Sequence, residues 1–239
     1  MTAISAVLFD LDGVLISTDK GVIALWQEVL ARYGVRATGD ELRRHAIGCS
    51  AEHTIGHFLS AYDEPVRVAA LDDVRAAEPL LDFEVVPGAG ELLAAFAMAG
   101  IRMACVTGAS EPRLARALSA LRARSIVEAT VAWGDVPYGK PAPDSYLLAA
   151  ERLRLAAAQC LVIEDAVGGV LAAVAAGCPC IGLATHDDAE ALDMAGATVV
   201  VESLQSLTLS ASYDGGHLLS TDEGDFYFPP TGKTEIGLG

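Results

Sequence analysis

The sequence predicts an α/β fold, a doubly wound parallel sheet with helices on both faces. Two observations support this fold class. Short apolar runs typical of buried strands alternate with longer helical patterns over most of the 239 residues. Prolines lie near the starts of several helical patterns, and glycines lie just past their ends. Strands that alternate with helices pair in parallel through right-handed crossovers, and ligands then bind at the carboxyl edge of the sheet.

The predicted strands are short, apolar and free of internal charge clusters, and they cover residues 5–9, 101–106, 126–131, 160–163, 180–183 and 197–201. The helices predicted between them cover residues 88–99, 112–122, 143–154, 166–176 and 187–195. Pro112 and Pro143 lie where a first-turn proline is tolerated. Gly100, Gly177 and Gly196 lie where helices end.

One stretch, residues 17–81, interrupts this alternation with helical periodicity alone. It contains four helical patterns, at residues 19–33, 39–46, 51–61 and 64–77. We therefore expect a small all-helical cap domain inserted after the first strand and seated over the carboxyl edge of the sheet. The core domain would then comprise residues 1–16 and 82–204.

The segment 205–239 has a different character. Leu207 and Leu209 alternate with polar residues, Asp214 begins a turn-like sequence, and the aromatic run 226–228 follows. A hairpin, an oligomer contact and a loose tail all explain this pattern. The three alternatives stay open at this point.

The composition excludes several classes of protein. The formal charge of −16 argues against a broad nucleic acid or anionic membrane partner, which needs clustered lysine and arginine. The longest uncharged stretch, 166–185, contains several glycines and a proline and is better read as a helix followed by a buried strand. No cationic leader precedes the first strand, so we expect a soluble cytoplasmic protein. Five scattered cysteines indicate buried hydrophobic residues in a reducing compartment, without a catalytic role.

Two carboxylates, Asp10 and Asp12, follow the first predicted strand. Residues two apart in a strand point to one face, and Gly13 then lets the chain turn away. Buried carboxylates are costly unless compensated, and a hard cation such as Mg²⁺ neutralises them through oxygen ligation. Taken alone, the pattern is better explained by a polar strand end and a turn.

Three later positions carry polar residues at the same edge. Thr107 and Gly108 follow a strand and precede a helix, where a hydroxyl and free amides suit a phosphate oxygen. Lys140 precedes another helix and can face an anion. Glu164 and Asp165 follow the strand that ends at residue 163. Turn chemistry, an exposed lysine and helix capping explain each one separately, so only their shared location makes the set specific.

In chain order these residues supply an acid pair, a hydroxyl, a lysine and a second acid pair. This order resembles the haloacid dehalogenase-like hydrolase superfamily, whose pattern is DxD, Thr or Ser, Lys and a terminal acidic motif. The segments GKPAPD and IEDAVGG are close to the family's usual wording, and the resemblance covers about the first two hundred residues. The helical insertion is similar to the cap of phosphoglycolate phosphatase-like and β-phosphoglucomutase-like members.

The resemblance implies a role for each motif residue. Asp10 would attack phosphorus and form an aspartyl-phosphate. Asp12 would protonate the leaving alkoxide and then accept a proton from the hydrolytic water. Thr107, Gly108 and Lys140 would hold the phosphoryl oxygens.

The resemblance also implies the cofactor. Mg²⁺ would be held by the Asp10 carboxylate, the Asp12 carbonyl and Asp165, with Glu164 beside them. The cap would select the leaving group. Its candidate lining residues are Trp26, His45, Cys49, Ser50 and His53.

The function implied is Mg²⁺-dependent hydrolysis of a small phosphomonoester by a monomer or small homo-oligomer, with a small phosphorylated metabolite as its partner. A sugar-phosphate mutase is the nearest alternative. However, Val22 stands where mutase-like members carry a histidine, and Ala51 stands where they carry an arginine, which favours hydrolysis. A noncatalytic phosphate-binding module is a further alternative, although binding alone would not require a second aspartate at residue 12.

Overall fold

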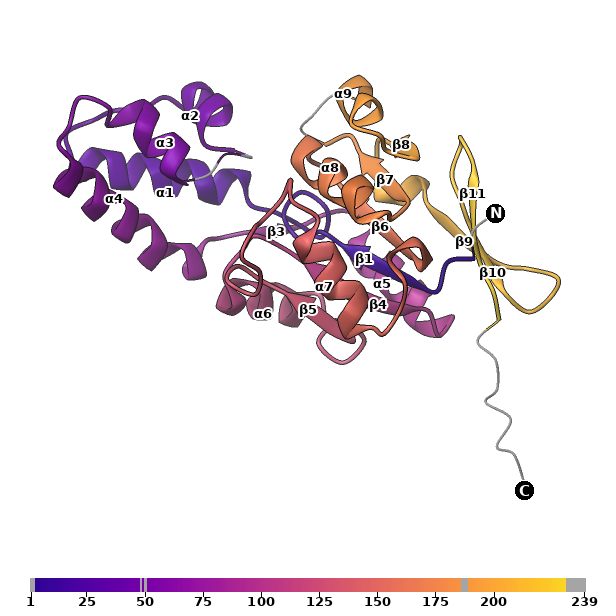
Figure 1. Ribbon diagram of the computed structural model, residues 1–239. Helices are drawn as coiled ribbons and strands as arrows, with labels where there is room; N and C mark the ends of the chain where they lie inside the picture. Colours follow the sequence, from indigo (N-terminus) through magenta and orange to yellow (C-terminus); the bar gives the residue numbers. More distant parts are fainter. Residues whose placement is uncertain (1–2, 48, 50, 186–188, 231–239) are drawn as a thin grey trace.

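The computed structural model describes residues 3–47, 49, 51–185 and 189–230 (Figure 1). Its centre is a six-stranded parallel sheet with the strand order β5-β4-β1-β6-β7-β8. The strands are β1 (Ala6–Phe9), β4 (Arg102–Val106), β5 (Ala129–Val131), β6 (Cys160–Glu164), β7 (Cys180–Leu183) and β8 (Val199–Val201). The predicted fold class is therefore confirmed, and each of these strands lies within one residue of a predicted strand or inside it.

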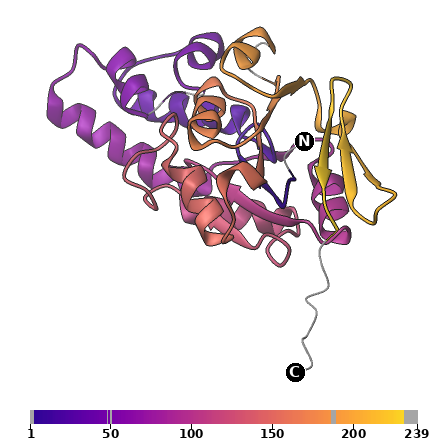
Figure 2. The same cartoon turned by 45° about the vertical axis from the view of Figure 1, so that its right-hand side comes forward.

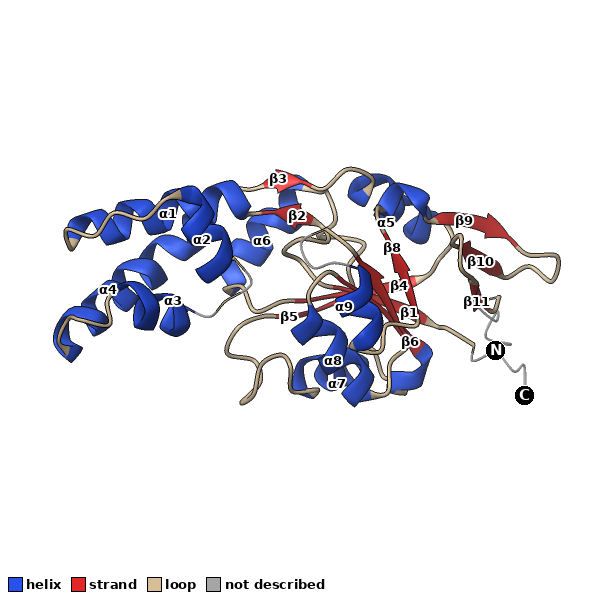
Figure 3. Cartoon of the chain, turned by 90° about the horizontal axis from the view of Figure 1, so that it is seen from above, coloured by secondary structure: helices blue, strands red, loops and turns tan. Residues whose placement is uncertain are grey.

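Helices cover both faces of this sheet (Figure 3). One face carries α5 (Ala89–Met98) and α6 (Glu111–Ala120), and the other carries α7 (Asp144–Arg152), α8 (Val167–Ala176) and α9 (Ala189–Met194). Successive residues of β1 alternate between the two layers, because side chains of a strand point to opposite faces. Val7 and Phe9 pack in the first apolar cluster, whereas Ala6 and Leu8 pack in the second. Burial on both faces explains why β1 is apolar throughout.

Four helices follow β1 and form a separate layer at the left of Figure 1. They are α1 (Asp19–Arg32), α2 (Gly39–His45), α3 (Ala51–Phe58) and α4 (Glu64–Ala77). We call them the cap. Thr38 and Glu41 form a capping box at the start of α2, and the Asp63 side chain accepts a hydrogen bond from Val66 N at the start of α4. Trp26 and Leu30 lie in the cap's own apolar cluster.

The chain crosses between core and cap through two short strands that the sequence analysis did not predict. β2 (Ile16–Ser17) leaves the core and pairs antiparallel with β3 (Glu84–Val85), which returns to it. A short 3₁₀ helix, η1 (Glu78–Leu80), joins α4 to this return. Two-residue strands are too short to carry a period-two pattern, which is why the sequence gives no sign of them.

The segment after residue 204 forms a three-stranded antiparallel sheet on the side of the core away from the cap (Figures 1 and 2). Its strands are β9 (Thr208–Ala211), β10 (His217–Ser220) and β11 (Asp225–Phe228). The Phe228 ring is buried and lies 5.9 Å from the Phe96 ring of α5. Ile4 N also donates a hydrogen bond to the Tyr227 carbonyl. Residues 208–228 are thus packed on the core rather than forming a loose tail.

The described helices include none that combines the length and apolarity needed to cross a membrane. The uncharged stretch 166–185 contains α8 and β7, as the sequence predicts. Cys105, Cys160, Cys178 and Cys180 are buried and free. Burial raises the pKa of Cys160 to about 11 and that of Cys178 to about 12, so both remain thiols near neutral pH.

Candidate active site

The carboxyl ends of three neighbouring strands and one loop bring the motif residues together. Asp10 follows β1, Thr107 follows β4, and Glu164 and Asp165 lie at the end of β6. Lys140 comes from the loop before α7. All five line one pocket of about 590 Å³, which also has walls from the cap. The shared strand edge proposed from the sequence is therefore a single site in space.

Two glycines make room for the acidic side chains. A Cβ atom at Gly13 would lie 1.8 Å from Asp165 Oδ2, and the backbone φ of +85° there also disfavours other residues. A Cβ atom at Gly169, in the first turn of α8, would lie 1.8 Å from Glu164 Oε1. Both positions need glycine because a carboxylate occupies the space of the missing side chain.

Three buried carboxylates meet at the floor of this pocket. Asp10, Glu164 and Asp165 each offer an oxygen within 4.8 Å of the others, and their exposures are 7%, 1% and 7%. Burial raises the pKa of Asp10 well above its usual value, and Lys140 opposes that rise. One lysine cannot balance three carboxylates. An all-oxygen, net negative donor set of this kind fits a hard divalent cation such as Mg²⁺.

Lys140 is held from three sides. Its ammonium donates hydrogen bonds to Asp10, to Glu164 at 2.6 Å and to the Val106 carbonyl at 3.2 Å. It also lies 5.1 Å from the centre of the Tyr146 ring. Burial alone would lower the pKa of Lys140, but the neighbouring carboxylates outweigh burial and raise that pKa above its usual value. The side chain is therefore a fixed cation.

Glu164 accepts four hydrogen bonds. Oε1 accepts from Lys140 at 2.6 Å and from the Tyr146 hydroxyl at 2.9 Å. Oε2 accepts from the backbone N–H groups of Asp165 and Ala166 at 2.9 and 3.1 Å. Two donors on each oxygen occupy the four acceptor sites of a carboxylate. Asp165 accepts a hydrogen bond from Thr185 Oγ1 at 3.3 Å.

Asp12 has different neighbours from Asp10. Thr18 Oγ1 donates to Asp12 Oδ1 at 3.0 Å, and Arg113 donates to both carboxylate oxygens at 2.9 Å. Burial raises the pKa of Asp12, while Arg113 and then the Thr18 hydrogen bond lower it. Thr107 Oγ1 lies 3.5 Å from Asp12 Oδ2, and it accepts a hydrogen bond from Ala109 N at 2.9 Å. Asp12 thus lies beside the hydroxyl proposed for phosphate binding.

The sequence analysis missed two residues of this network, Arg113 and Tyr146. Each is buried on a helix that begins just after a motif loop, α6 for Arg113 and α7 for Tyr146. Their spacing from the motifs matches ordinary core positions of those helices. For Arg113, the sequence signal is an arginine placed among the apolar positions of a helix. Such a position predicts burial, and a buried arginine needs an ion pair.

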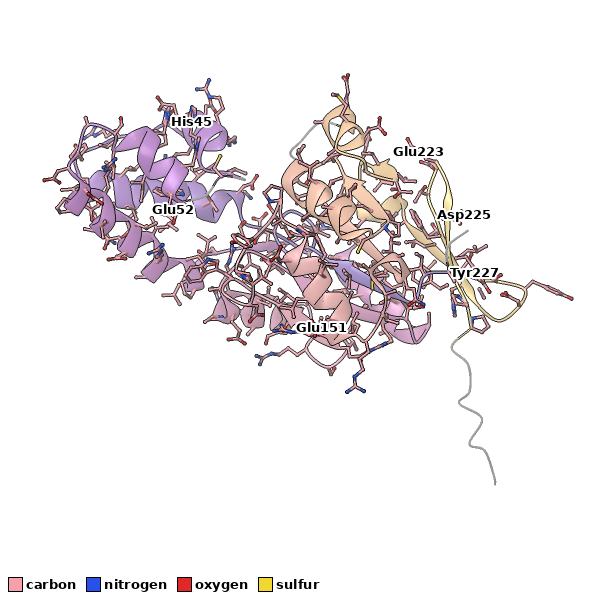
Figure 4. The ribbon with its side chains drawn as sticks, viewed as in Figure 1. His45, Glu52, Glu151, Glu223, Asp225 and Tyr227 are labelled. Carbon is pink, nitrogen blue, oxygen red and sulfur yellow. The ribbon has the colours of Figure 1, made fainter. Side chains whose placement is uncertain are left out.

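The cap wall of the pocket differs from the one expected. Trp26 is 4% exposed in the cap's apolar cluster. His45 stacks on His57 with 3.7 Å between ring centres (His45 is labelled in Figure 4). Neither Trp26, His45 nor His53 is among the described residues that line the pocket, and Ser50 lies outside the described residues.

The described cap residues that do line the pocket are mostly small or apolar. They are Thr18, Asp19, Val22, Ala46, Ile47 and Cys49. Cys49 was expected, whereas the others come from the start of α1 and the end of α2. Gly108, from the core, also lines the pocket, and a Cβ atom there would meet open space.

Comparisons with known proteins agree with this geometry. A family model described as haloacid dehalogenase-like hydrolase matches residues 4–177. The chain is 34% identical to hexitol phosphatase A of Escherichia coli (strain K12), over 87% of this chain and 95% of that protein. It is 35% identical to validoxylamine A 7'-phosphate phosphatase of Streptomyces hygroscopicus subsp. limoneus, over 82% and 92% of the two chains.

Solved structures show the same relationship. A HAD family hydrolase from Deinococcus radiodurans R1, crystallised with bound phosphate and sodium, superposes with a TM-score of 0.68 and 31% identity. The match covers 86% of this chain and 93% of that one. The fold, the geometry of the site and the relatives all indicate the same family, and the matches cover most of the chain. The chain therefore belongs to the haloacid dehalogenase-like hydrolase family, and within it the protein is a phosphoric monoester hydrolase.

Proposed function

We propose that the protein hydrolyses a small phosphomonoester in an Mg²⁺-dependent reaction with a phosphorylated Asp10 as intermediate. One observation carries this proposal most strongly. Asp10 lies at the carboxyl end of β1 within a pocket that also contains the fixed cation Lys140 and the carboxylate of Asp165. A nucleophile, a cation and a second acid in one small pocket suit phosphoryl transfer, in which positioning and charge stabilisation supply most of the catalysis.

In the first step, an oxygen of Asp10 attacks phosphorus in line with the leaving oxygen. The new bond joins Asp10 to phosphorus, and the bond from phosphorus to the leaving oxygen breaks. Asp12 gives its proton to that oxygen, so an alcohol leaves. Lys140 and Thr107 hold the equatorial phosphoryl oxygens, where negative charge gathers in the transition state.

In the second step, Asp12 accepts a proton from water as that water attacks phosphorus. The bond between Asp10 and phosphorus breaks, which releases phosphate and leaves Asp10 ionised and Asp12 protonated, as both were at the start. Separate roles for Asp10 and Asp12 are supported by their different partners, Lys140 for the first and Arg113 with Thr18 for the second.

The residues suited to hold Mg²⁺ are Asp10 and Asp165, together with the Asp12 carbonyl that the family resemblance implies. Glu164 is better suited to orient Lys140, because its acceptor sites are already occupied by four donors. When bound, Mg²⁺ supplies charge neutralisation for the phosphoryl oxygens and the clustered carboxylates.

We propose a sugar or polyol phosphate as the class of substrate. The pocket volume of about 590 Å³ suits a small metabolite, and a relative with 34% identity is named as a hexitol phosphatase. Val22 lines the cap side of the pocket and cannot transfer a proton, which favours hydrolysis over a mutase reaction. Ala51 likewise provides no charge to hold a second phosphate.

The test is phosphate release from an aryl phosphate by purified wild-type protein and Asp10→Asn. We expect release that needs Mg²⁺, stops with EDTA, and falls by at least about 10³-fold in Asp10→Asn, because the nucleophile is lost. Unchanged secondary structure and thermal midpoint of the variant serve as the control for folding. Equal activity of the two proteins at matched purity would contradict the proposal.

A further inference from the structure

Arg113 joins the Asp12 carboxylate to residues 78–85, the return linker through which the chain passes from the cap back to the core. It is the third residue of α6, and its side chain is 9% exposed. Its two terminal nitrogens each donate to one oxygen of Asp12, both at 2.9 Å. Its Nε lies 2.8 Å from Oε1 of Glu78, although that N–H is not aligned for a hydrogen bond. One guanidinium therefore contacts both Asp12 and the first residue of η1.

The return linker forms further hydrogen bonds with α6 and with Ser110, the residue before it. Ser110 N donates to Glu78 Oε1 at 3.1 Å. Arg116 donates to the Pro79 carbonyl at 2.7 Å and to the Leu81 carbonyl at 3.2 Å. Among the described contacts, Arg116 reaches the linker but not Asp12, whose partners are Thr18, Thr107 and Arg113. A variant of Arg116 therefore serves as a control, because it loses contacts to the linker without losing a contact to Asp12.

The Arg113 contact restricts how Asp12 can turn. A guanidinium that pairs with both carboxylate oxygens fixes the plane of the carboxyl group, which a single hydrogen bond does not. Thr18 adds a third donor on Oδ1. An acid held in one orientation delivers its proton more often than one that rotates freely, because proton transfer needs close alignment with the leaving oxygen.

We propose that Arg113 is a positioning residue that orients the Asp12 carboxylate for proton transfer and, through Glu78, ties that orientation to the return linker of the cap. This inference rests on the proposed function, in which Asp12 protonates the leaving oxygen. A purely structural arginine, or one that binds phosphate, would affect all substrates alike. A positioning residue affects mainly those substrates whose leaving group needs a proton.

The experiment compares phenyl phosphate with 2,4-dinitrophenyl phosphate. Phenolate needs a proton as it leaves and dinitrophenolate does not, so only the first substrate depends on the acid. In Arg113→Met we expect kcat/KM for phenyl phosphate to fall about 10- to 100-fold. For dinitrophenyl phosphate we expect a change below about threefold. Asp12→Asn removes the acid and should show the same selectivity with a larger loss.

Three further variants separate positioning from structure. Arg113→Lys keeps the charge but cannot pair with both oxygens, so its selective loss should be partial. Glu78→Gln removes the charged contact with the linker and should also reduce activity on phenyl phosphate selectively. Arg116→Met removes contacts to the same linker, and it should change kcat/KM for the two substrates by the same factor.

Equal losses on both substrates in Arg113→Met and Arg113→Lys would overturn the proposal. If Arg113→Met does not fold, the question is decided by Arg113→Lys and Glu78→Gln. For these variants the loss of kcat/KM on phenyl phosphate is divided by the loss on dinitrophenyl phosphate. Failure of the proposed function has another signature. Wild-type protein would then release no phosphate from either substrate, or Asp12→Asn would lack the selectivity, and the positioning role would fall with it.

Discussion

Lys140 illustrates how the pocket holds charges of both signs away from water. Its ammonium contacts two carboxylates, a carbonyl and an aromatic ring. These four contacts compensate the buried positive charge of Lys140. Glu164 in turn is fixed by Lys140, by the Tyr146 hydroxyl and by two backbone N–H groups. The orientation of the site side chains thus depends in part on hydrogen-bonding partners, such as Tyr146, that lie outside the sequence motifs.

Gly168 and Gly169 offer a matched pair at this scale. In Gly169→Ala the new methyl group collides with Glu164, whereas at Gly168 it meets nothing within 4 Å. We expect Gly169→Ala to lower the thermal midpoint by about 4–8 °C, which corresponds to about 2 kcal/mol, and to reduce kcat. Gly168→Ala should stay within about 2 °C of wild type. Calorimetry of both variants tests this, and equal midpoints would contradict the proposed packing of Glu164.

The C-terminal sheet has a structural role at the scale of elements. β9, β10 and β11 have little of the pattern typical of a long strand, yet Leu219, Phe226 and Phe228 are buried against the core. Figure 4 labels Asp225 and Tyr227 on β11, on the opposite side of the core from the cap residues His45 and Glu52. The sheet therefore supports the core at a distance from the active site.

Phe228→Ala should show this support directly. Phe228 is 2% exposed and packs on Phe96, and truncating a buried phenylalanine costs about 3–5 kcal/mol. The expected fall in thermal midpoint is about 6–20 °C, with kcat at 25 °C little changed in the folded fraction. Tyr213→Ala is the control, because that side chain is fully exposed. A Phe228→Ala midpoint equal to that of Tyr213→Ala would show that the sheet does not stabilise the core.

The elements differ in how far the sequence predicts them. Strands of the central sheet are buried on both faces, so continuous apolar runs such as 160–163 mark them clearly. The pairing of β2 with β3 and the packing of Phe228 depend on contacts between distant segments, which no local pattern records. The same holds at the site. Asp10 and Lys140 stand out through motif chemistry, whereas Arg113 and Tyr146 are recognisable only through the partners that the fold gives them.

At the scale of the whole molecule, core and cap have separate apolar clusters with the pocket between them. The formal charge of −16 is compatible with an anionic substrate, because Lys140 and the proposed Mg²⁺ set the local charge. Three carboxylates close together also repel one another, and this repulsion opposes folding when no cation is bound. Metal binding and stability should therefore be linked.

Millimolar Mg²⁺ should raise the thermal midpoint of the wild-type protein. At a concentration of about 100 times Kd the gain is about 2.7 kcal/mol, which corresponds to about 5–10 °C. Asp165→Asn should lose this shift. Its midpoint without metal should exceed that of the wild type, because one of the three buried charges is gone. A full Mg²⁺ shift in Asp165→Asn, measured by calorimetry with an EDTA blank, would argue against Asp165 as a ligand.

The central claim is that Asp10 becomes phosphorylated during turnover. The most direct measurement mixes the protein with an aryl phosphate and Mg²⁺, quenches in acid, reduces acyl phosphates with borohydride and locates the reduced residue by mass spectrometry. The account predicts homoserine at position 10, none at position 12, and no product from Asp10→Asn. Reduction at another residue, or undiminished turnover by Asp10→Asn, would contradict it.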